Sequence, residues 1–293
     1  MDNVFSRSWT LTKLSFSVIK NDKELLIFPF LSAFFSLAVL ALFWLPLRFF
    51  FDQSAPGQSP ASLWISLFLL YFLLTLCSTF FSVCAVHIIK KRLEGGTEGL
   101  SESFAFAFSR IKVILAWSLL SATVSVVLRM LESLASNRRG SNPLNFIVNL
   151  LIGFFVMGLK LSWTIVTLFV VPAMVYKNLG PWEAIKDSTQ TIKKTWGESL
   201  VRSYGLGLME LIFLVAGVVA LLVLGFGLGS MTNSAVGVLT AVPLIVAYIG
   251  VLVAVFSLAN TVFNTALYAY AATGEIPQGF SKDVLNNAFQ NKE

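Results

Sequence analysis

Six long apolar windows run through the chain and constrain its fold more than any other feature. Each holds about 20 mostly apolar residues, the length that crosses the hydrocarbon core of a bilayer. They lie near residues 25–50, 62–89, 112–135, 146–176, 200–227 and 236–271. With 56% hydrophobic and only 12% charged residues, the chain could not hide this much apolar surface from water. We therefore expect an all-α polytopic membrane helix bundle, with six transmembrane helices in three hairpins.

The placement of lysine and arginine predicts the orientation of this bundle. Most cations lie near the N-terminus, in the connections at 90–112 and 177–202, and near the C-terminus. The opposite side holds only Arg48, Arg129, Arg138 and Arg139. Cytoplasmic loops of membrane proteins carry more lysine and arginine than the loops on the other side. Both termini are therefore predicted to be cytoplasmic. The net charge of +6 therefore needs no nucleic acid partner, and the expected partners are the lipid bilayer and its anionic headgroups.

Segments that precede the hairpins resemble one another, which predicts an internal repeat. Aligning Gly99 with Gly180 also places Glu102 on Glu183. We interpret the chain as one membrane domain, 1–293, with repeats over 5–95, 100–178 and 181–278 and a terminal amphipathic helix over 280–290. The competing interpretation is that any polytopic protein with short cytoplasmic helices looks faintly periodic.

The segment GPWEAIKDSTQTIKKTWGES, residues 180–199, predicts a helix of about 15 residues that lies along the cytoplasmic membrane surface. One face of this amphipathic helix holds Trp182, Ile185, Thr189, Ile192 and Trp196, which are spaced three or four residues apart. Together with the N-terminal segment, it supplies the candidate lipid-interface residues Trp9, Trp182, Lys186, Lys193, Lys194 and Trp196. Such helices either form a collar at the membrane surface that senses lipid or gates a path, or they anchor and orient the hairpins.

Residues that carry enzyme chemistry are nearly absent. His87 is the only histidine, and its position beside Lys90 and Lys91 is ordinary for an interfacial side chain. Cys77 and Cys84 are seven residues apart in one helix, which is too far for a disulfide. No zinc-binding, phosphate-binding or nucleophile motif occurs. We therefore expect no catalytic residue, cofactor or metal site, and no enzyme activity.

Polar side chains inside the apolar windows are the candidate functional residues. Glu210 lies in GLGLMELIFLVAG, and an acid in hydrocarbon is costly. It either binds a proton or another cation, or pairs with a neighbouring helix. Asn260 and Asn264 lie one turn apart in the sixth window, where they either bond across helices or line a polar path.

Lys160 interrupts the fourth window and has two interpretations. It either marks the outer boundary of a span over 161–177, with 144–159 as an outer interfacial helix, or it is a buried cation and a partner for Glu210. The spacing of residues does not decide between these alternatives.

Three stretches carry a resemblance to known proteins. They are SRSWTLTKLSFSVIKNDKELLIFPFLSA near the start, VVPAMVYKNLGPWEAIKDSTQTIKKTWGES in the middle and FNTALYAYAATGEIP near the end. Together they resemble an uncharacterised prokaryotic family of six-span integral membrane proteins, a domain of unknown function. More loosely, the chain is similar to Yip1-like proteins and to membrane domains attached to glycerophosphodiester phosphodiesterases. The resemblance implies a multi-pass protein of the prokaryotic inner (cell) membrane, without a substrate, cofactor or site residue.

Two classes of function fit these observations. A transporter or channel, as a single chain or a homo-oligomer, would line its path with Glu210, Asn260, Asn264 and Lys160. A non-transporting membrane organiser would bind lipid or a partner protein through the interfacial helices. The sequence favours transport slightly, because Glu210 and the paired asparagines exceed what a plain anchor needs.

Overall fold

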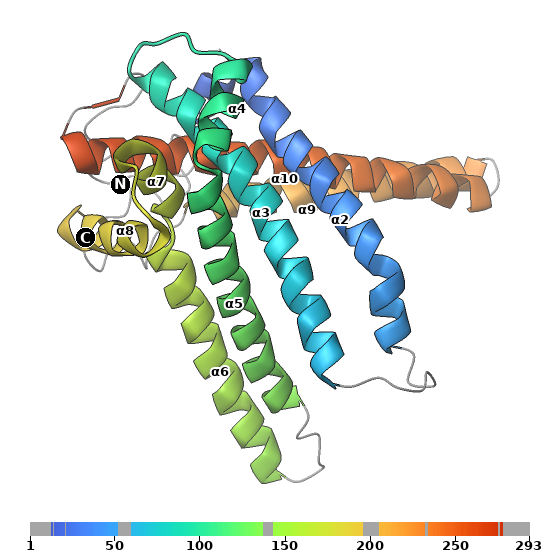
Figure 1. Cartoon of the computed structure of the whole chain (residues 1–293). Coiled ribbons are helices and arrows are strands. Elements are labelled where there is room, and N and C mark those ends of the chain that lie inside the picture. Colours follow the sequence, from blue (N-terminus) through green and yellow to red (C-terminus); the bar gives the residue numbers. More distant parts are fainter. Residues whose placement is uncertain are drawn as a thin grey trace, which may run out of the picture. The chain divides into compact units, whose positions relative to one another are not determined.

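The computed structural model describes residues 13, 15–20, 22–51, 60–136, 143–195, 205–231, 234–274 and 276–277, and these residues form helices without a strand (Figure 1). The helices are η1 (Lys23–Leu26), α2 (Ile27–Phe51), α3 (Pro60–Leu93), α4 (Leu100–Ser109), α5 (Ile111–Ser136), α6 (Pro143–Val166), α7 (Val170–Lys177), α8 (Pro181–Thr195), α9 (Gly205–Met231) and α10 (Ser234–Thr273). The predicted all-α class is confirmed.

Five helical segments are long and apolar enough to cross a membrane within the part of the chain that the structure describes. They are Lys23–Trp44, Ala61–Leu93, Ile111–Ser133, Leu151–Lys177 and Val242–Thr273. The fifth predicted window overlaps α9, in which Glu210–Leu221 forms an apolar segment among the residues whose side chains the structure describes. A membrane-embedded helical protein is therefore established, whereas six spans in three hairpins stay a prediction.

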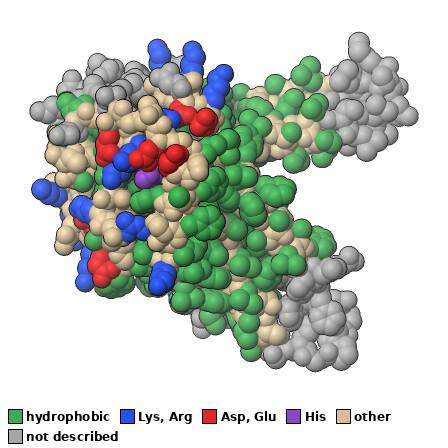
Figure 2. Space-filling view, turned by 45° about the horizontal axis from the view of Figure 1, so that its top comes forward, with side chains coloured by type: hydrophobic (Ala, Val, Ile, Leu, Met, Phe, Trp, Pro, Cys, Tyr) green, Lys and Arg blue, Asp and Glu red, His purple; other side chains and the backbone are tan. Residues whose placement is uncertain are grey.

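Large apolar side chains cover much of the surface, as a lipid-exposed protein requires. On α2, Phe34 is 65% exposed and Leu42 is 70% exposed, and on α6 Phe154 is 65% exposed. Figure 2 shows broad areas of apolar side chains with few charged ones among them. A water-soluble monomer rarely exposes a contiguous apolar patch of this kind.

The chain divides into two compact units, each made of separate stretches of sequence. One unit contains Met1–Phe30, Ile89–Thr97 and Lys193–Glu293, and the other contains Leu31–Ile88 and Glu98–Ile192. We refer to them as the α9–α10 unit and the α5–α6 unit. The repeats proposed from the sequence and the single membrane domain are not tested by this division, and both stay predictions.

The α5–α6 unit is built on two helices that lie side by side (Figure 1). One stripe of α5 is buried and has the spacing of a single helical face: Ile114, Trp117, Ser118, Ser121 and Ala122. Trp117 stacks on Trp163 of α6, with ring centroids 6.0 Å apart. Small side chains in the rest of the stripe let helices approach closely, which is how helices associate in lipid.

An aromatic cluster joins α2, α3 and α4 within the same unit. Phe81 of α3 stacks on Phe35 of α2 at a centroid distance of 5.6 Å and meets Phe104 of α4 edge-on at 6.4 Å. Phe80 contacts Phe108 of α4 at 5.0 Å. The aromatic rings of Phe80 and Phe81, two successive residues of α3, therefore attach the short helix α4 to α3.

The two aligned segments of the sequence begin their helices alike. Gly99 directly precedes α4, and its N–H donates to Glu102 Oε2 at 3.1 Å. Gly180 directly precedes α8, where the Glu183 carboxylate comes so close that an added Cβ would lie 2.6 Å from Oε2. Both glutamates satisfy or approach the free N–H groups of a first helical turn. The alignment of Gly99 with Gly180 therefore matches two helix N-termini, each with a preceding glycine and a glutamate at the third helical position.

A break separates α6 from α7 at residues 167–169. Pro172 follows in the first turn of α7, where a missing N–H costs little. The helix is therefore interrupted between α6 and α7, and this turn is stabilised by a bond of 3.1 Å from the Phe169 N–H to Ser188 Oγ of α8. In contrast, α6 continues through Lys160, so residues 144–159 do not form a separate helix.

The α9–α10 unit contains a closely packed pair of helices (Figure 1). Tyr248 of α10 lies over Gly217 of α9 and donates a hydrogen bond of 2.6 Å to the Phe213 carbonyl. Phe213 also contacts Phe256, with ring centroids 6.0 Å apart. These contacts fix the antiparallel register of the two helices. In the same unit, Asp22 accepts a hydrogen bond of 2.6 Å from Arg92 Nε.

Gly217→Ala tests this register, with Gly250→Ala as its matched control. A Cβ on Gly217 would lie 2.1 Å from Tyr248 Cζ, whereas one on Gly250 of α10 meets nothing within 4 Å. We expect Gly217→Ala to destabilise the protein by about 1–3 kcal/mol because the Tyr248 ring must move. Gly250→Ala should be neutral or stabilising, since alanine favours helix. Thermal unfolding in detergent measures both, and equal midpoints would contradict the close approach.

Candidate functional site

A cluster of three charged side chains lies between α5 and α6. Glu132 Oε1 accepts a hydrogen bond from Lys160 Nζ, and Glu132 Oε2 lies 3.3 Å from Arg129 Nη1. Their side chains remain 32%, 49% and 59% exposed in the order Glu132, Lys160, Arg129. Lys160 is therefore not an isolated cation, because Glu132 is its partner.

Glu132 is not among the functional residues predicted from the sequence. A signal was available, since Arg129 and Glu132 are three residues apart and face each other on a helix. Lys160 follows Glu132 by 28 residues, and the two side chains meet only because α5 packs against α6. No local spacing in the sequence predicts this contact.

These charges border an open groove of about 520 Å³. Its walls are formed by Arg129, Glu132, Ser133, Gly153, Val156, Met157 and Lys160. Small-molecule sites commonly have volumes of roughly 300–1,000 Å³. The groove therefore has three charged side chains, an apolar wall and a volume within the range of small-molecule sites.

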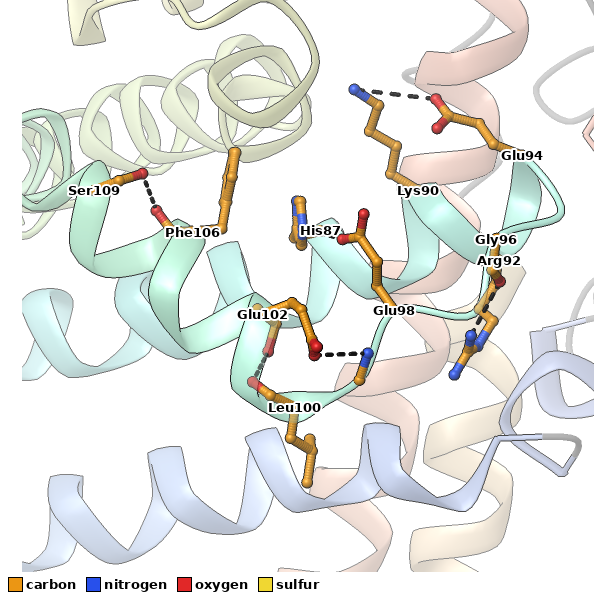
Figure 3. Close-up of polar contacts among 12 residues, drawn as sticks. His87, Lys90, Arg92, Glu94, Gly96, Glu98, Leu100, Glu102, Phe106 and Ser109 are labelled. Carbon is orange, nitrogen blue, oxygen red and sulfur yellow. Dashed lines mark hydrogen bonds and ion pairs between the residues drawn. The ribbon is translucent and has the colours of Figure 1, made fainter.

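A second polar cluster holds α4 against the end of α3 (Figure 3). His87 is buried, and its Nε2 lies 2.7 Å from Glu98 Oε2. The imidazole also stacks on Phe106 of α4 at a centroid distance of 4.1 Å. The Arg110 guanidinium lies 5.3 Å from the centre of the same Phe106 ring.

The sequence did not predict that His87 is buried or that it has a carboxylate partner. It is buried because α4 folds back over it, and Glu98 reaches it from the connection between α3 and α4. Among the described residues, no group of three or more His, Cys, Asp or Glu side chains could hold a metal ion. The geometry indicates a structural clamp between two helices.

The candidate pathway residues of the α9–α10 unit lie in neighbouring helices. Glu210 of α9 is half-buried, and its carboxylate makes no ion pair or side-chain hydrogen bond with the described residues. The register set by Phe213 and Phe256 places Glu210 within about two helical turns of Asn260 along the helix axis. The Asn260 Oδ1 atom is buried and accepts no hydrogen bond from the described chain. Asn264 lies one turn further on and is half-buried.

Helix α8, Pro181–Thr195, lies within the predicted segment 180–199 and has the predicted length of about 15 residues. Its buried side chains are Ala184, Ser188 and Ile192, so the face that packs on the protein is rotated by roughly 80° from the predicted apolar stripe. Trp182 is 59% exposed, with Lys186 Nζ 6.0 Å from its ring. Lys193 and Lys194 are exposed as well. Contact between this surface and a membrane stays a prediction.

Several predicted elements lie outside the described residues. These are Trp9, Trp196 and the terminal amphipathic helix over 280–290. Of the candidate lipid-interface residues, the structure therefore describes only those that lie in α8.

These features define the class of protein. Five apolar segments of membrane-spanning length, an apolar surface and a few clustered charges identify a helical, membrane-embedded protein. The chain belongs to a family of unknown function, DUF6159, whose model matches residues 61–279. No curated protein and no solved structure matches the chain. The expected membership of a family of unknown function is thus confirmed, while similarity to Yip1-like proteins stays a prediction.

Glu98→Ala tests the clamp on α4, and Glu94→Ala is the matched control. Glu98 bonds the buried His87, whereas Glu94 lies 4.0 Å from Lys90 on a more exposed site. We expect Glu98→Ala to cost about 1–3 kcal/mol, because a buried imidazole loses its carboxylate partner. Glu94→Ala should change stability by less than about 0.5 kcal/mol. Thermal unfolding of the detergent-solubilised chain compares them, and an equal loss in both variants would argue against a clamp.

Proposed function

We propose that this protein is a membrane transporter or channel for a cation and that Glu210 binds the cation. The supporting observation is that the Glu210 carboxylate, in an apolar helix, makes no ion pair or side-chain hydrogen bond with the described residues. An intramembrane carboxylate without a protein partner is expensive, unless an ion, a proton or water satisfies it.

Asn260 adds a second unsatisfied group on the neighbouring helix. A buried amide oxygen that accepts no hydrogen bond carries a desolvation cost, which a cation or water would remove. Carboxylate and amide oxygens are suitable ligands for hard cations. Lys160 is left out of this proposed path, because Glu132 already pairs with it.

An organiser that holds anionic lipid at the membrane surface is the second candidate function. It is favoured by the outward position of Trp182 and Lys186 on α8, combined with the attachment of α8 to the protein. Ser188 binds the Phe169 N–H, and Asp187 accepts a hydrogen bond of 2.5 Å from Lys177. A tryptophan beside lysines on an anchored helix suits the boundary between headgroups and acyl chains.

For both functions we place the protein in a prokaryotic inner membrane with cytoplasmic termini. The distribution of lysine and arginine along the sequence supports this orientation. The extensive apolar surface is compatible with lipid contact and with homo-oligomers. We also propose that the protein is not an enzyme.

Transport predicts that Glu210→Gln removes cation flux without unfolding the protein. Proteoliposomes that contain the wild-type chain should dissipate an imposed gradient of protons, sodium or potassium. Glu210→Gln keeps the volume of the side chain but removes its charge, so we expect flux to fall at least tenfold. The control Glu94→Gln changes an exposed carboxylate and should retain flux.

Two results would count against transport through Glu210. One is a wild-type protein that passes none of the three cations. The other is unchanged flux in Glu210→Gln. A large fall in its unfolding temperature would assign the carboxylate a structural role instead.

Lipid binding by α8 predicts closer contact between Trp182 and anionic lipid. Brominated lipids quench nearby tryptophans, and the difference between wild type and Trp182→Phe isolates this residue. We expect stronger quenching by brominated phosphatidylglycerol than by phosphatidylcholine, with the difference reduced when Lys186, Lys193 and Lys194 are changed to glutamine. Glutamine at the three exposed lysines Lys13, Lys20 and Lys23 is the matched control. Equal quenching by both lipids would contradict this role.

A further inference from the structure

The groove between α5 and α6 has a charge pattern that neither proposed function uses. Glu132 divides its two carboxylate oxygens between Lys160 and Arg129. One negative charge therefore faces two positive charges, which leaves a net charge of +1. Most of the Arg129 side chain and about half of the Lys160 side chain are exposed, so both retain N–H donors that Glu132 does not use.

A cation is a poor fit for this groove. Both oxygens of its single carboxylate already accept hydrogen bonds, and the other charged wall residues are cations. An anion with several acceptor oxygens fits better, because Arg129 and Lys160 could each donate to it. Phosphate has this chemistry.

The wall beside these charges is apolar. Val156 and Met157 line the groove, and Met157 is 66% exposed. On the same helix Phe154 and Phe155 are 65% and 63% exposed. A ligand with a phosphate and an attached hydrocarbon part would contact both kinds of surface, while a free phosphate would leave the apolar wall uncovered.

We propose that this groove binds the phosphate headgroup of a membrane phospholipid. Arg129 and Lys160 donate hydrogen bonds to the phosphate oxygens, and the lipid chains run along the exposed apolar side chains of α6. The net charge of the groove favours an anionic phospholipid such as phosphatidylglycerol over a zwitterionic one. Glu132 holds the two cations in position.

Two glycines of α6 supply a matched pair of variants for the test. A Cβ added to Gly153 or to Gly158 meets no atom within 4 Å, so both positions accept a larger side chain. Only Gly153 lines the groove. Leucine gains helix propensity equally at both positions, so a difference between Gly153→Leu and Gly158→Leu reports on filling the groove.

The experiment measures phosphatidylglycerol bound to the full chain, purified in detergent and stripped of lipid, by native mass spectrometry. We expect Gly153→Leu and Arg129→Gln each to lower occupancy at least fivefold, with Gly158→Leu equal to wild type. Phosphatidylethanolamine should bind less, and millimolar inorganic phosphate should leave the bound lipid in place. If Gly153→Leu fails to fold, Arg129→Gln carries the test, because its substituted side chain is mostly exposed.

Three results would overturn the proposal. The first is unchanged occupancy in both Gly153→Leu and Arg129→Gln. The second is an equal loss in Gly158→Leu, which would mean that the groove is not the site. The third is displacement of the lipid by inorganic phosphate, which would identify a site for free phosphate instead.

Discussion

Backbone N–H and C=O groups cannot be left unpaired in hydrocarbon, and the helices of this protein depend on that constraint. The described parts of the apolar windows are mainly helical because only a helix satisfies these groups within one segment of chain. Since lipid is as apolar as the side chains themselves, helices then associate through close packing. The contacts of Tyr248 with Gly217, and of Trp117 with Trp163, are of this kind.

Charged side chains follow a second constraint, because a charge next to hydrocarbon must be paired or satisfied. Several of the described charges pair across a turn or between helices, at separations of 10 to 70 residues. The pairs are His87 with Glu98, Asp22 with Arg92, Glu132 with Lys160, and Lys177 with Asp187. Each pair also ties a connection or helix to a neighbour. The Glu210 carboxylate, in an apolar helix, makes no such pair with the described residues, and for that reason it carries the proposed function.

Helix α8 shows how far local sequence predicts structure. Its limits follow from a proline in the first turn, a glutamate at the third helical position and apolar residues at helical spacing. The face that packs against the protein was not predictable from these signals, because Ala184 and Ser188 are less apolar than Trp182. Their small size and the Ser188 hydrogen bond to Phe169 decide the contact.

By itself the sequence determined the environment of the protein, its helical class and the approximate limits of its helices. These properties depend on amino-acid composition and on the spacing of apolar residues within one segment, and both can be seen directly in the sequence. Only the tertiary structure decided that Lys160 pairs with Glu132, that His87 is buried beneath α4 and that a charged groove opens between α5 and α6. Each of these arises where helices pack together, and the partners across such a contact have no fixed spacing in the sequence.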